Sequence, residues 1–287
     1  MEVRRMRKEA KVELRLLLRC CFLCFVSGFF ASLLFLQEGG SLAGGGPRGK
    51  FTVEEVEPLP PAVLHGRTGE SKTASIPFQV LSWKPRAFYF PGFATKEQCE
   101  DITETARARL EPSKLMLREG ETPENTKGIR TSTGTFLRAS EDSTGTLEEI
   151  EQKIARVSLI PRENGEPFNV LRYELGQRYA SHYDAFDPAE YGPQTSSRVA
   201  TFILYLSDVE EGGETAFPFE NGSNMDTGFD YKECIGLKIK PNRGDGLLFF
   251  SMFLNQTIDP TSLHGSCPVR KGEKWVVTKW MRDQKLV

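Results

Sequence analysis

The part of the chain after Pro161 constrains the fold most strongly, because it contains a series of short segments with the composition of β-strands. These segments are rich in β-branched and aromatic residues, and turns such as Gly-Gln, Glu-Gly-Gly and Lys-Gly-Glu separate them. Many short strands without intervening helices predict an antiparallel sandwich or a jelly roll. The expected strands are Phe168–Leu175, Arg178–Asp184, Arg198–Leu206, Cys234–Lys240, Gly246–Phe250 and Lys274–Met281.

Two helices and two further strands are expected before this region. An apolar strand at Val80–Phe90 opens the folded domain, and Thr95 is positioned to cap a helix from Lys96 to Leu110. A strand at Arg130–Leu137 and a second helix at Thr146–Val157 follow. We expect the helices to support the sheet, which makes the fold an all-β core with flanking helices (α+β).

A polar stretch between Arg118 and Arg130 is too long and too hydrophilic for a simple turn. Such a segment is either a plain surface loop or a mobile lid over a substrate groove. The sequence of residues 119–130 leaves both interpretations open.

The N-terminus has the pattern of a membrane anchor. Seven Lys or Arg residues precede Cys20, and the seventeen residues from Cys20 to Leu36 carry no charge. We expect a cytoplasmic basic tail at 1–15, a single transmembrane signal anchor at 16–36, a flexible lumenal stem at 37–80 and the folded domain at 81–287. The alternative is a cleaved signal peptide, since Ser41-Leu42-Ala43 resembles a cleavage site.

A type II anchor would place the folded domain in the lumen of the endoplasmic reticulum or Golgi. Asn221 and Asn255 begin glycosylation sequons, and Cys99, Cys234 and Cys267 can form at most one disulfide there, with the pairing left open. A net charge of −2 argues against a nucleic-acid partner, because no basic excess is present to neutralise phosphates. No Walker or Rossmann glycine pattern indicates a nucleotide enzyme.

Two histidines and one aspartate form a candidate metal site. His182 and Asp184 are two residues apart, so in an extended segment their side chains leave the same face. His264 would complete a set of two imidazoles and one carboxylate, an arrangement that leaves coordination positions open and suits non-haem Fe(II) oxygenases. Taken alone, His182 and Asp184 could instead be surface residues or hydrogen-bonded core residues. His65 lies in the predicted stem and is expected to have no role.

A lysine follows His264 by ten residues and is expected to enter the same site. The turn Lys271-Gly272-Glu273 should bring the following strand back beside His264, with Lys274, Val276, Thr278 and Trp280 on one face. A lysine that points into an apolar interior needs an anion, because an unpaired buried ammonium is costly. The anion is either a protein carboxylate or the carboxylate of a ligand.

These motifs together resemble the prolyl 4-hydroxylases of the Fe(II)- and 2-oxoglutarate-dependent dioxygenase superfamily, most closely those of plants. The resemblance covers Ser82 to Asp283 and rests on His182-Tyr183-Asp184, on the segment from Arg198 to Thr215, and on the segments around His264 and Lys274. It implies a double-stranded β-helix (jelly roll) and an enzyme of the procollagen-proline 4-dioxygenase type. Such an enzyme hydroxylates C4 of peptidyl proline while oxidising 2-oxoglutarate to succinate and CO2.

The resemblance also implies roles for individual residues. The metal ligands would be His182, Asp184 and His264. The 2-oxoglutarate contacts would be Lys274 at the distal carboxylate, with Tyr173 and Thr215. The residues of the substrate groove would be Tyr179, Arg198 and Trp280. A lysine at position 274 favours proline as the substrate, since the related lysyl hydroxylases use arginine there.

The implied cofactors are Fe(2+), 2-oxoglutarate, O2 and L-ascorbate, and the implied substrate is a proline-rich secretory or cell-wall protein in the polyproline II conformation. No assembly region is present, so no obligatory protein disulfide isomerase subunit is implied. The alternatives are a catalytically silent peptide-binding module, an oxygenase that acts on another substrate, and a zinc cupin, which would leave Lys274 unexplained.

Overall fold

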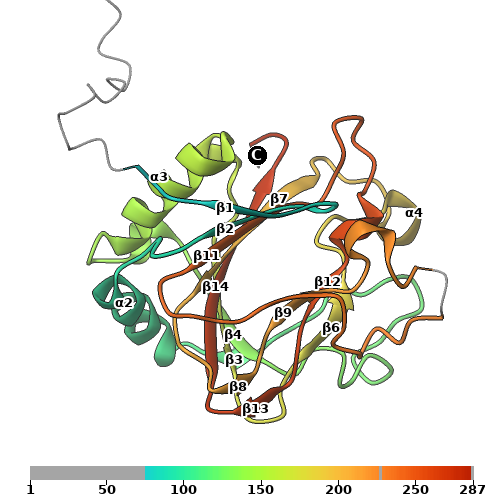
Figure 1. Cartoon of the computed structure of the whole chain (residues 1–287), viewed down its shortest axis with the longest axis horizontal. Helices are drawn as coiled ribbons and strands as arrows, with labels where there is room; N and C mark the ends of the chain where they lie inside the picture. The colour runs from blue at the N-terminus through green and yellow to red at the C-terminus, as the bar shows by residue number, and fades with distance from the viewer. Residues whose placement is uncertain (1–74, 226–227, 286–287) are drawn as a thin grey trace, which may run out of the picture. The chain divides into compact units, whose positions relative to one another are not determined.

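An eight-stranded antiparallel sheet is the largest element of the fold (Figure 1). The computed structural model describes residues 75–225 and 228–285. The strand order is β1-β2-β11-β7-β14-β5-β4-β3. The bounds are β1 (Gln79–Trp83), β2 (Arg86–Phe90), β3 (Glu111–Pro112), β4 (Thr133–Leu137), β5 (Phe168–Tyr173), β7 (Arg198–Tyr205), β11 (Gly246–Phe250) and β14 (Lys274–Arg282).

A four-stranded antiparallel sheet of order β10-β9-β12-β6 faces the large sheet. Apolar side chains from both sheets form one core cluster between them, with Phe217 and Ile239 on one side and Leu171 and Val276 on the other. This mostly β core with few helices is consistent with a jelly-roll oxygenase fold. The remaining bounds are β6 (Tyr179–His182), β9 (Thr215–Phe217), β10 (Leu237–Ile239), β12 (His264–Ser266) and, in a separate two-stranded sheet, β8 (Glu211–Gly212) and β13 (Val269–Lys271).

Two helices, α2 (Lys96–Arg107) and α3 (Thr146–Ser158), cover the outer face of the large sheet (Figure 1). Their buried residues pack against outward-facing side chains of β5, β7 and β14, as the sequence predicted. Thr95 caps α2 as expected. The other helical segments are α4 (Pro188–Tyr191) and the short 3-10 turns η1 (Ala139–Glu141), η2 (Arg162–Asn164), η3 (Glu220–Gly222) and η4 (Pro260–Ser262).

Strands β7 and β14 lie at the centre of the large sheet and are buried on both faces. Alternate residues of β14 therefore belong to different environments, since Trp275 and Val277 pack toward the helices while Lys274 and Val276 point between the sheets. The sequence predicted this alternation. It also predicted that Lys274 returns beside His264, but β14 pairs with β5 and β7 in the opposite sheet, so the lysine approaches across the sandwich.

Several predicted boundaries were wrong. The strands expected to begin at Arg130 and Cys234 begin at Thr133 and Leu237. The single strand expected at Val80–Phe90 is a hairpin of β1 and β2, whose turn contains the Lys84-Pro85 peptide bond in the cis form. Proline lacks the amide proton that a continuing strand needs. The helix expected to reach Leu110 ends at Arg107, because the chain then turns to pair Glu111 with β4. The strand expected to include Asp184 ends at His182.

The cysteines of the folded domain and the predicted anchor have different outcomes. Cys234 and Cys267 form a disulfide, and Cys99 is a buried free thiol. The predicted tail, the anchor at 16–36 and most of the stem lie outside the described residues. Within the described part of the chain, no helix has the length and apolar character needed to cross a membrane.

Candidate functional site

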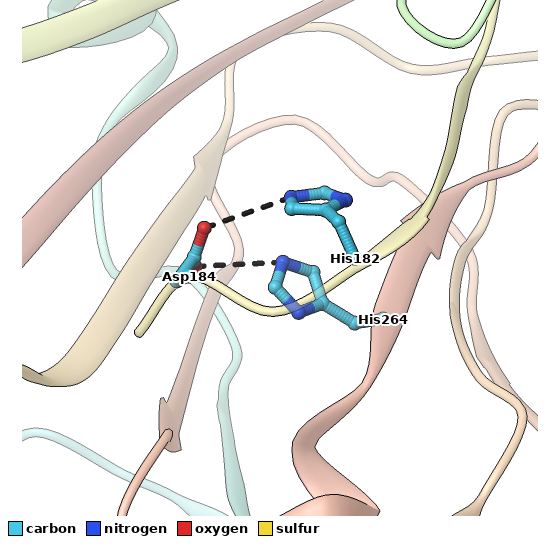
Figure 2. A group of neighbouring side chains, drawn as sticks. All are labelled: His182, Asp184 and His264. Atoms are coloured by element: carbon cyan, nitrogen blue, oxygen red, sulfur yellow. Dashed lines mark ion pairs between the residues drawn. The ribbon is translucent and has the colours of Figure 1, made fainter. Parts of the chain in front are cut away.

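Three side chains with metal-ligand atoms meet at one end of the smaller sheet (Figure 2). His182 ends β6 and His264 begins β12, and the antiparallel pairing of these strands places the two residues opposite each other. Asp184 follows two residues after His182. Its Oδ1 lies 3.6 Å from His182 Nε2, and its Oδ2 lies 3.5 Å from His264 Nε2. The candidate ligands predicted from the sequence therefore come together in space.

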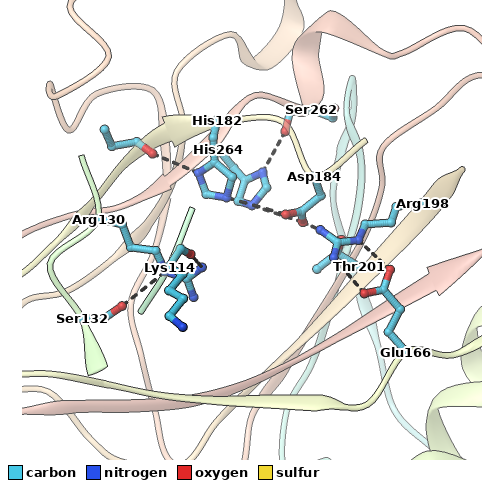
Figure 3. Close-up of polar contacts among 11 residues, drawn as sticks. Lys114, Arg130, Ser132, Glu166, His182, Asp184, Arg198, Thr201, Ser262 and His264 are labelled. Atoms are coloured by element: carbon cyan, nitrogen blue, oxygen red, sulfur yellow. Dashed lines mark hydrogen bonds and ion pairs between the residues drawn. The ribbon is translucent and has the colours of Figure 1, made fainter. Parts of the chain in front are cut away.

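Backbone carbonyls fix the orientation of both imidazoles. His182 Nδ1 lies 2.9 Å from the Ala180 carbonyl oxygen, and His264 Nδ1 lies 3.0 Å from that of Ser262 (Figure 3). A carbonyl can only accept, so each Nδ1 carries the proton and each Nε2 keeps its lone pair toward Asp184. Burial lowers the pKa of His264 to about 4, so this imidazole is neutral at pH 7. Two imidazoles held in this orientation beside a carboxylate fit a divalent metal such as Fe(II).

The Asp184 carboxylate is buried and ionised. Burial acts to raise its pKa, but the neighbouring His264 and His182 and the charge of Arg198 lower the pKa overall. A buried anion is costly unless it is paired or coordinates a metal. The donor set of this site thus suits a cation, and the three ligand atoms lie within 4.8 Å of one another.

Lys274 supplies a buried positive group on the other side of the same cavity. Its side chain is 2% exposed, and its Nζ donates to Ser266 Oγ at 2.8 Å. Among the described residues, no carboxylate lies within ion-pair distance of the ammonium. Burial lowers the pKa of Lys274 to about 7, with Glu214 acting in the opposite direction. Of the two anions considered from the sequence, a ligand carboxylate is the one that these contacts favour.

Hydroxyl groups surround the ammonium of Lys274. Tyr173 and Thr215 line the cavity with it, as expected for residues that contact the same ligand. Tyr205 donates from its hydroxyl to Thr215 Oγ1 at 2.8 Å, which leaves the Thr215 hydroxyl proton available to a ligand. Burial raises the pKa of Tyr173, so this phenol remains a donor at neutral pH. This end of the cavity can therefore satisfy a carboxylate with charge and several donors.

One cavity, open to solvent, reaches from Lys274 to the three candidate metal ligands, and its volume with the open mouth included is about 440 Å³. The side chains between the two ends are apolar, namely Leu171, Ile203 and Val276. A ligand that spans the cavity would thus meet the Lys274 ammonium at one end, a metal at the other end, and apolar walls in between.

Two of the three predicted groove residues, Tyr179 and Trp280, line this cavity, and the third, Arg198, does not. Tyr179 stacks on the His182 ring with 3.7 Å between ring centroids. Trp280 is 7% exposed, and its Nε1 has no hydrogen-bond partner among the described residues. Arg198 forms a two-point ion pair with Glu166 (Figure 3). Its guanidinium carbon lies 3.8 Å from the centroid of the Trp280 ring. Arg198 thus contacts the cavity wall through Trp280.

The segment 119–130, interpreted from the sequence as a surface loop or a lid, is held at both ends. Arg130, at its end, lines the cavity and lies 4.7 Å from the Tyr179 ring centroid. Arg118, at its start, forms an ion pair of 3.0 Å with Glu190 and donates to the Tyr191 hydroxyl at 3.2 Å. The segment therefore extends from α4 to the cavity wall. A lid over the cavity would need this position.

The two sequons differ in their surroundings. Asn255 is exposed, and its Oδ1 accepts from the amide and the hydroxyl of Thr257. Asn221 is also exposed, and its Nδ2 donates to Glu220 Oε1 at 2.5 Å. Glycosylation of either residue stays a prediction.

Several residues of the site have no sequence signal of their own. Ser266 contacts Lys274, Tyr205 contacts Thr215, and Arg130 and Thr278 line the cavity. Glu166 was expected at no site, yet its carboxylate pairs with Arg198, which contacts Trp280 in the cavity wall. Only the position of Ser266, two residues after His264 on a strand, offered a hint, because alternate residues share a face.

Comparisons with known proteins agree with this geometry. Residues 168–282 match the family described as the 2OG-Fe(II) oxygenase superfamily. The probable prolyl 4-hydroxylase 9 of Arabidopsis thaliana is 62% identical over 279 residues, which cover 96% of each chain. Prolyl 4-hydroxylase 13 of the same plant is 52% identical over 265 residues, which cover 92% of each chain.

A solved structure shares the fold. The viral collagen prolyl hydroxylase of Paramecium bursaria Chlorella virus-1, determined as a 2OG complex, is 25% identical to this chain with a TM-score of 0.50. The match covers 68% of this chain and 95% of the viral one.

Proposed function

The chain belongs to the prolyl 4-hydroxylases of the 2OG-Fe(II) oxygenase superfamily, and on that premise we propose that it hydroxylates C4 of proline residues in proline-rich polypeptides. It is a 2-oxoglutarate-dependent dioxygenase, and its reaction converts 2-oxoglutarate to succinate and CO2. The single observation that carries the assignment is the convergence of His182, Asp184 and His264 on one cavity with the unpaired ammonium of Lys274.

The three ligand residues would hold Fe(II). Their distances, the neutral His264 and the ionised Asp184 support this assignment. When bound, the metal supplies O2 activation, which is coupled to the oxidation of 2-oxoglutarate. The protein's own contribution is to fix two imidazoles and one carboxylate on one side, so that the opposite side stays accessible to co-substrates.

Lys274 would bind the distal carboxylate of 2-oxoglutarate, and Thr215 and Tyr173 would donate to it. The lowered pKa of Lys274 supports this role, because an arriving carboxylate restores the protonated form that burial disfavours. The apolar side chains of Leu171 and Ile203 would cover the methylene groups of the co-substrate. Binding thus orients the keto acid end of the co-substrate toward the metal ligands.

The proposed peptide site is the aromatic mouth of the cavity. Tyr179 and Trp280 offer two flat faces, and the Trp280 Nε1 offers a donor for a peptide carbonyl. Arg198 would hold Trp280 in place through the stacking contact. Aromatic faces suit a polyproline II chain, which is already extended and loses little conformational entropy on binding. We therefore propose secretory or cell-wall proline-rich proteins as substrates.

Four further parts of the proposal concern the cellular setting. L-ascorbate would keep the metal in its reduced state, and no protein disulfide isomerase subunit would be required. The N-terminal segment would anchor the enzyme in the endoplasmic reticulum or Golgi membrane, with the catalytic domain in the lumen. The Cys234–Cys267 disulfide and the exposed sequons at Asn221 and Asn255 suit such a compartment.

A coupled assay of the detergent-solubilised full-length chain tests the function. The protein is incubated with Fe(II), L-ascorbate, 2-oxoglutarate and a proline-rich peptide, and succinate and 4-hydroxyproline are both measured. We expect the two products in equal amounts. His182→Ala and Asp184→Ala should lose both products, whereas the matched control His65→Ala should keep them. Succinate without 4-hydroxyproline would reject the substrate, and neither product from a folded, iron-loaded protein would reject the enzyme.

A further inference from the structure

A buried hydroxyl contacts the carboxylate of the proposed metal site. Thr201, on β7, is 0% exposed, and its Oγ1 donates to Asp184 Oδ2 at 2.6 Å (Figure 3). Both imidazoles direct an Nε2 lone pair toward Asp184, so Thr201 is the hydrogen-bond donor that the described residues offer this carboxylate. A hydrogen bond from a hydroxyl to an ionised carboxylate at this distance belongs to the strong, charge-assisted class.

Asp184 needs such a tether because of its place in the chain. It lies two residues beyond the last residue of β6, so strand pairing does not fix its backbone. The two histidines, in contrast, lie on paired strands and have carbonyls that hold their Nδ1 atoms. Asp184 is thus the one proposed ligand whose orientation depends on a side chain of the opposite sheet.

Thr201 is well suited to hold a neighbour in place. Its strand lies at the centre of the large sheet, where Thr201 is paired with Phe249 on one side and with Trp280 on the other. A β-branched side chain on a strand has few rotamers available. Groups carried by paired strands are also held more precisely than groups on loops. The hydroxyl therefore has a defined position toward which the carboxylate must turn.

We propose that Thr201 is a positioning residue of this enzyme, whose hydroxyl holds Asp184 so that one carboxylate oxygen, Oδ1, is presented to the metal. This inference rests on the proposed metal site. A carboxylate free to rotate could offer both oxygens at once and would then take a coordination position that the co-substrates need. With Oδ2 engaged by Thr201, Asp184 acts as a single-oxygen ligand. The hydrogen bond from Thr201 would thus raise the affinity for the metal and keep coordination positions open for the co-substrates.

The test compares three variants of the full-length protein by their affinity for Mn(II), measured from the electron paramagnetic resonance signal of free Mn(II). Thr201→Val keeps the shape and removes the hydroxyl, and we expect it to bind Mn(II) about 10- to 100-fold more weakly. Thr201→Ser keeps the hydroxyl and should bind within about threefold of the wild type. Thr146→Val is the matched control, because it also loses a buried hydroxyl bond to a carboxylate, that of Asp101 at 3.0 Å, far from the site. It should bind Mn(II) as the wild type does.

A second readout separates positioning from a loss of stability. Thr201→Ser leaves a small cavity and should lower the melting temperature while it preserves Mn(II) affinity. Thr201→Val should lower Mn(II) affinity and should weaken or shift the absorption band of the anaerobic Fe(II)–2-oxoglutarate complex. If Mn(II) affinity follows the melting temperature in both variants, or if Thr201→Val binds Mn(II) as tightly as the wild type, the inference is overturned.

Two further comparisons keep the result decisive. If Thr201→Val does not fold, Thr201→Ala replaces it, because Ala and Ser both lack the methyl group and differ only by the hydroxyl. Weak Mn(II) binding by Ala but not by Ser supports the inference, and equal binding overturns it. If instead the wild type binds no Mn(II), or His182→Ala binds it equally well, the metal assignment itself fails. Failure of the inference and failure of the proposed function are therefore distinguishable.

Discussion

Replacement of Lys274 by Met should stabilise the ligand-free protein while it abolishes 2-oxoglutarate binding. The ammonium of Lys274 is buried, and Ser266 Oγ is its hydrogen-bond partner. Methionine has a similar length and no charge to desolvate. Replacement of a buried charge by an apolar side chain of similar volume often stabilises a protein. The same replacement removes the cation that the distal carboxylate of 2-oxoglutarate would meet.

The magnitude follows from the pKa of Lys274, which burial lowers from 10.5 to about 7. A drop of this size means that burial of the protonated lysine lowers the free energy of unfolding by about 5 kcal/mol well below pH 7, and by about 4 kcal/mol at pH 7. Loss of the hydrogen bond to Ser266 reduces the stability gained by the substitution by about 1 kcal/mol. The net gain for Lys274→Met is therefore about 3 kcal/mol at pH 7.

The gain should depend on pH in a defined direction. Between pH 7 and 10.5 the unfolded lysine binds a proton that the folded one does not, so the wild type becomes more stable as pH rises through this window. Methionine has no such dependence. The advantage of Lys274→Met should thus fall to about zero near pH 10.

Urea denaturation of the metal-free proteins at pH 7 and pH 10 measures these differences, and isothermal titration measures 2-oxoglutarate binding to the Mn(II) forms. We expect binding to weaken about 100-fold or more. Lys279→Met is the matched control, since Lys279 is equally buried but pairs with Glu151 at 2.5 Å. It should destabilise the protein by about 2 kcal/mol. A Lys274→Met protein that is less stable than the wild type at both pH values, or that binds 2-oxoglutarate normally, would refute the reasoning.

Three other perturbations have expected outcomes. Cys234→Ser opens a disulfide that closes 33 residues and should lower the free energy of unfolding by about 3 to 4 kcal/mol, an effect that vanishes when both proteins are measured in reductant. Gly236→Ala should cost more than about 2 kcal/mol in a thermal melt, because its Cβ would lie 2.2 Å from a backbone oxygen of β9. Gly120→Ala, with an equally positive φ but open space, should cost about 1 kcal/mol, and equal losses would remove the steric argument. Arg118→Gln, which breaks the ion pair with Glu190, should raise the KM for a proline-rich peptide up to about fivefold and leave that for 2-oxoglutarate unchanged. An unchanged peptide KM would favour a plain surface loop.

The sequence predicts the long elements well because each has a clear local pattern. The helix expected at Thr146–Val157 is α3, and its apolar residues recur at the helical period and cover the sheet. Strands β8, β9, β12 and β13 were not predicted, since two or three residues are too few to show an alternating pattern. The β1–β2 hairpin was predicted as one strand, because apolar residues lie on both sides of a turn of only two residues, Lys84 and Pro85.

The proposed metal ligands could be found from the sequence, and the residue proposed to position Asp184 could not. His182 and Asp184 lie close together in the chain, and His264 lies in a segment that resembles the family. Thr201 contacts Asp184 only because β7 passes behind the end of β6. Nothing around Thr201 in the chain distinguishes it from a threonine that fills a central strand. Contacts between the two sheets therefore required the structure.

The most direct test of the proposed reaction is the fate of labelled dioxygen. The full-length protein is supplied with Fe(II), 2-oxoglutarate and a proline-rich peptide under 18O2, and both products are analysed by mass spectrometry. We predict one labelled oxygen in each 4-hydroxyproline and one in each succinate, with the peptide label lost in His264→Ala. A hydroxyproline whose oxygen comes from water, or succinate labelled without peptide hydroxylation, would contradict the assignment of this chain as a prolyl 4-hydroxylase.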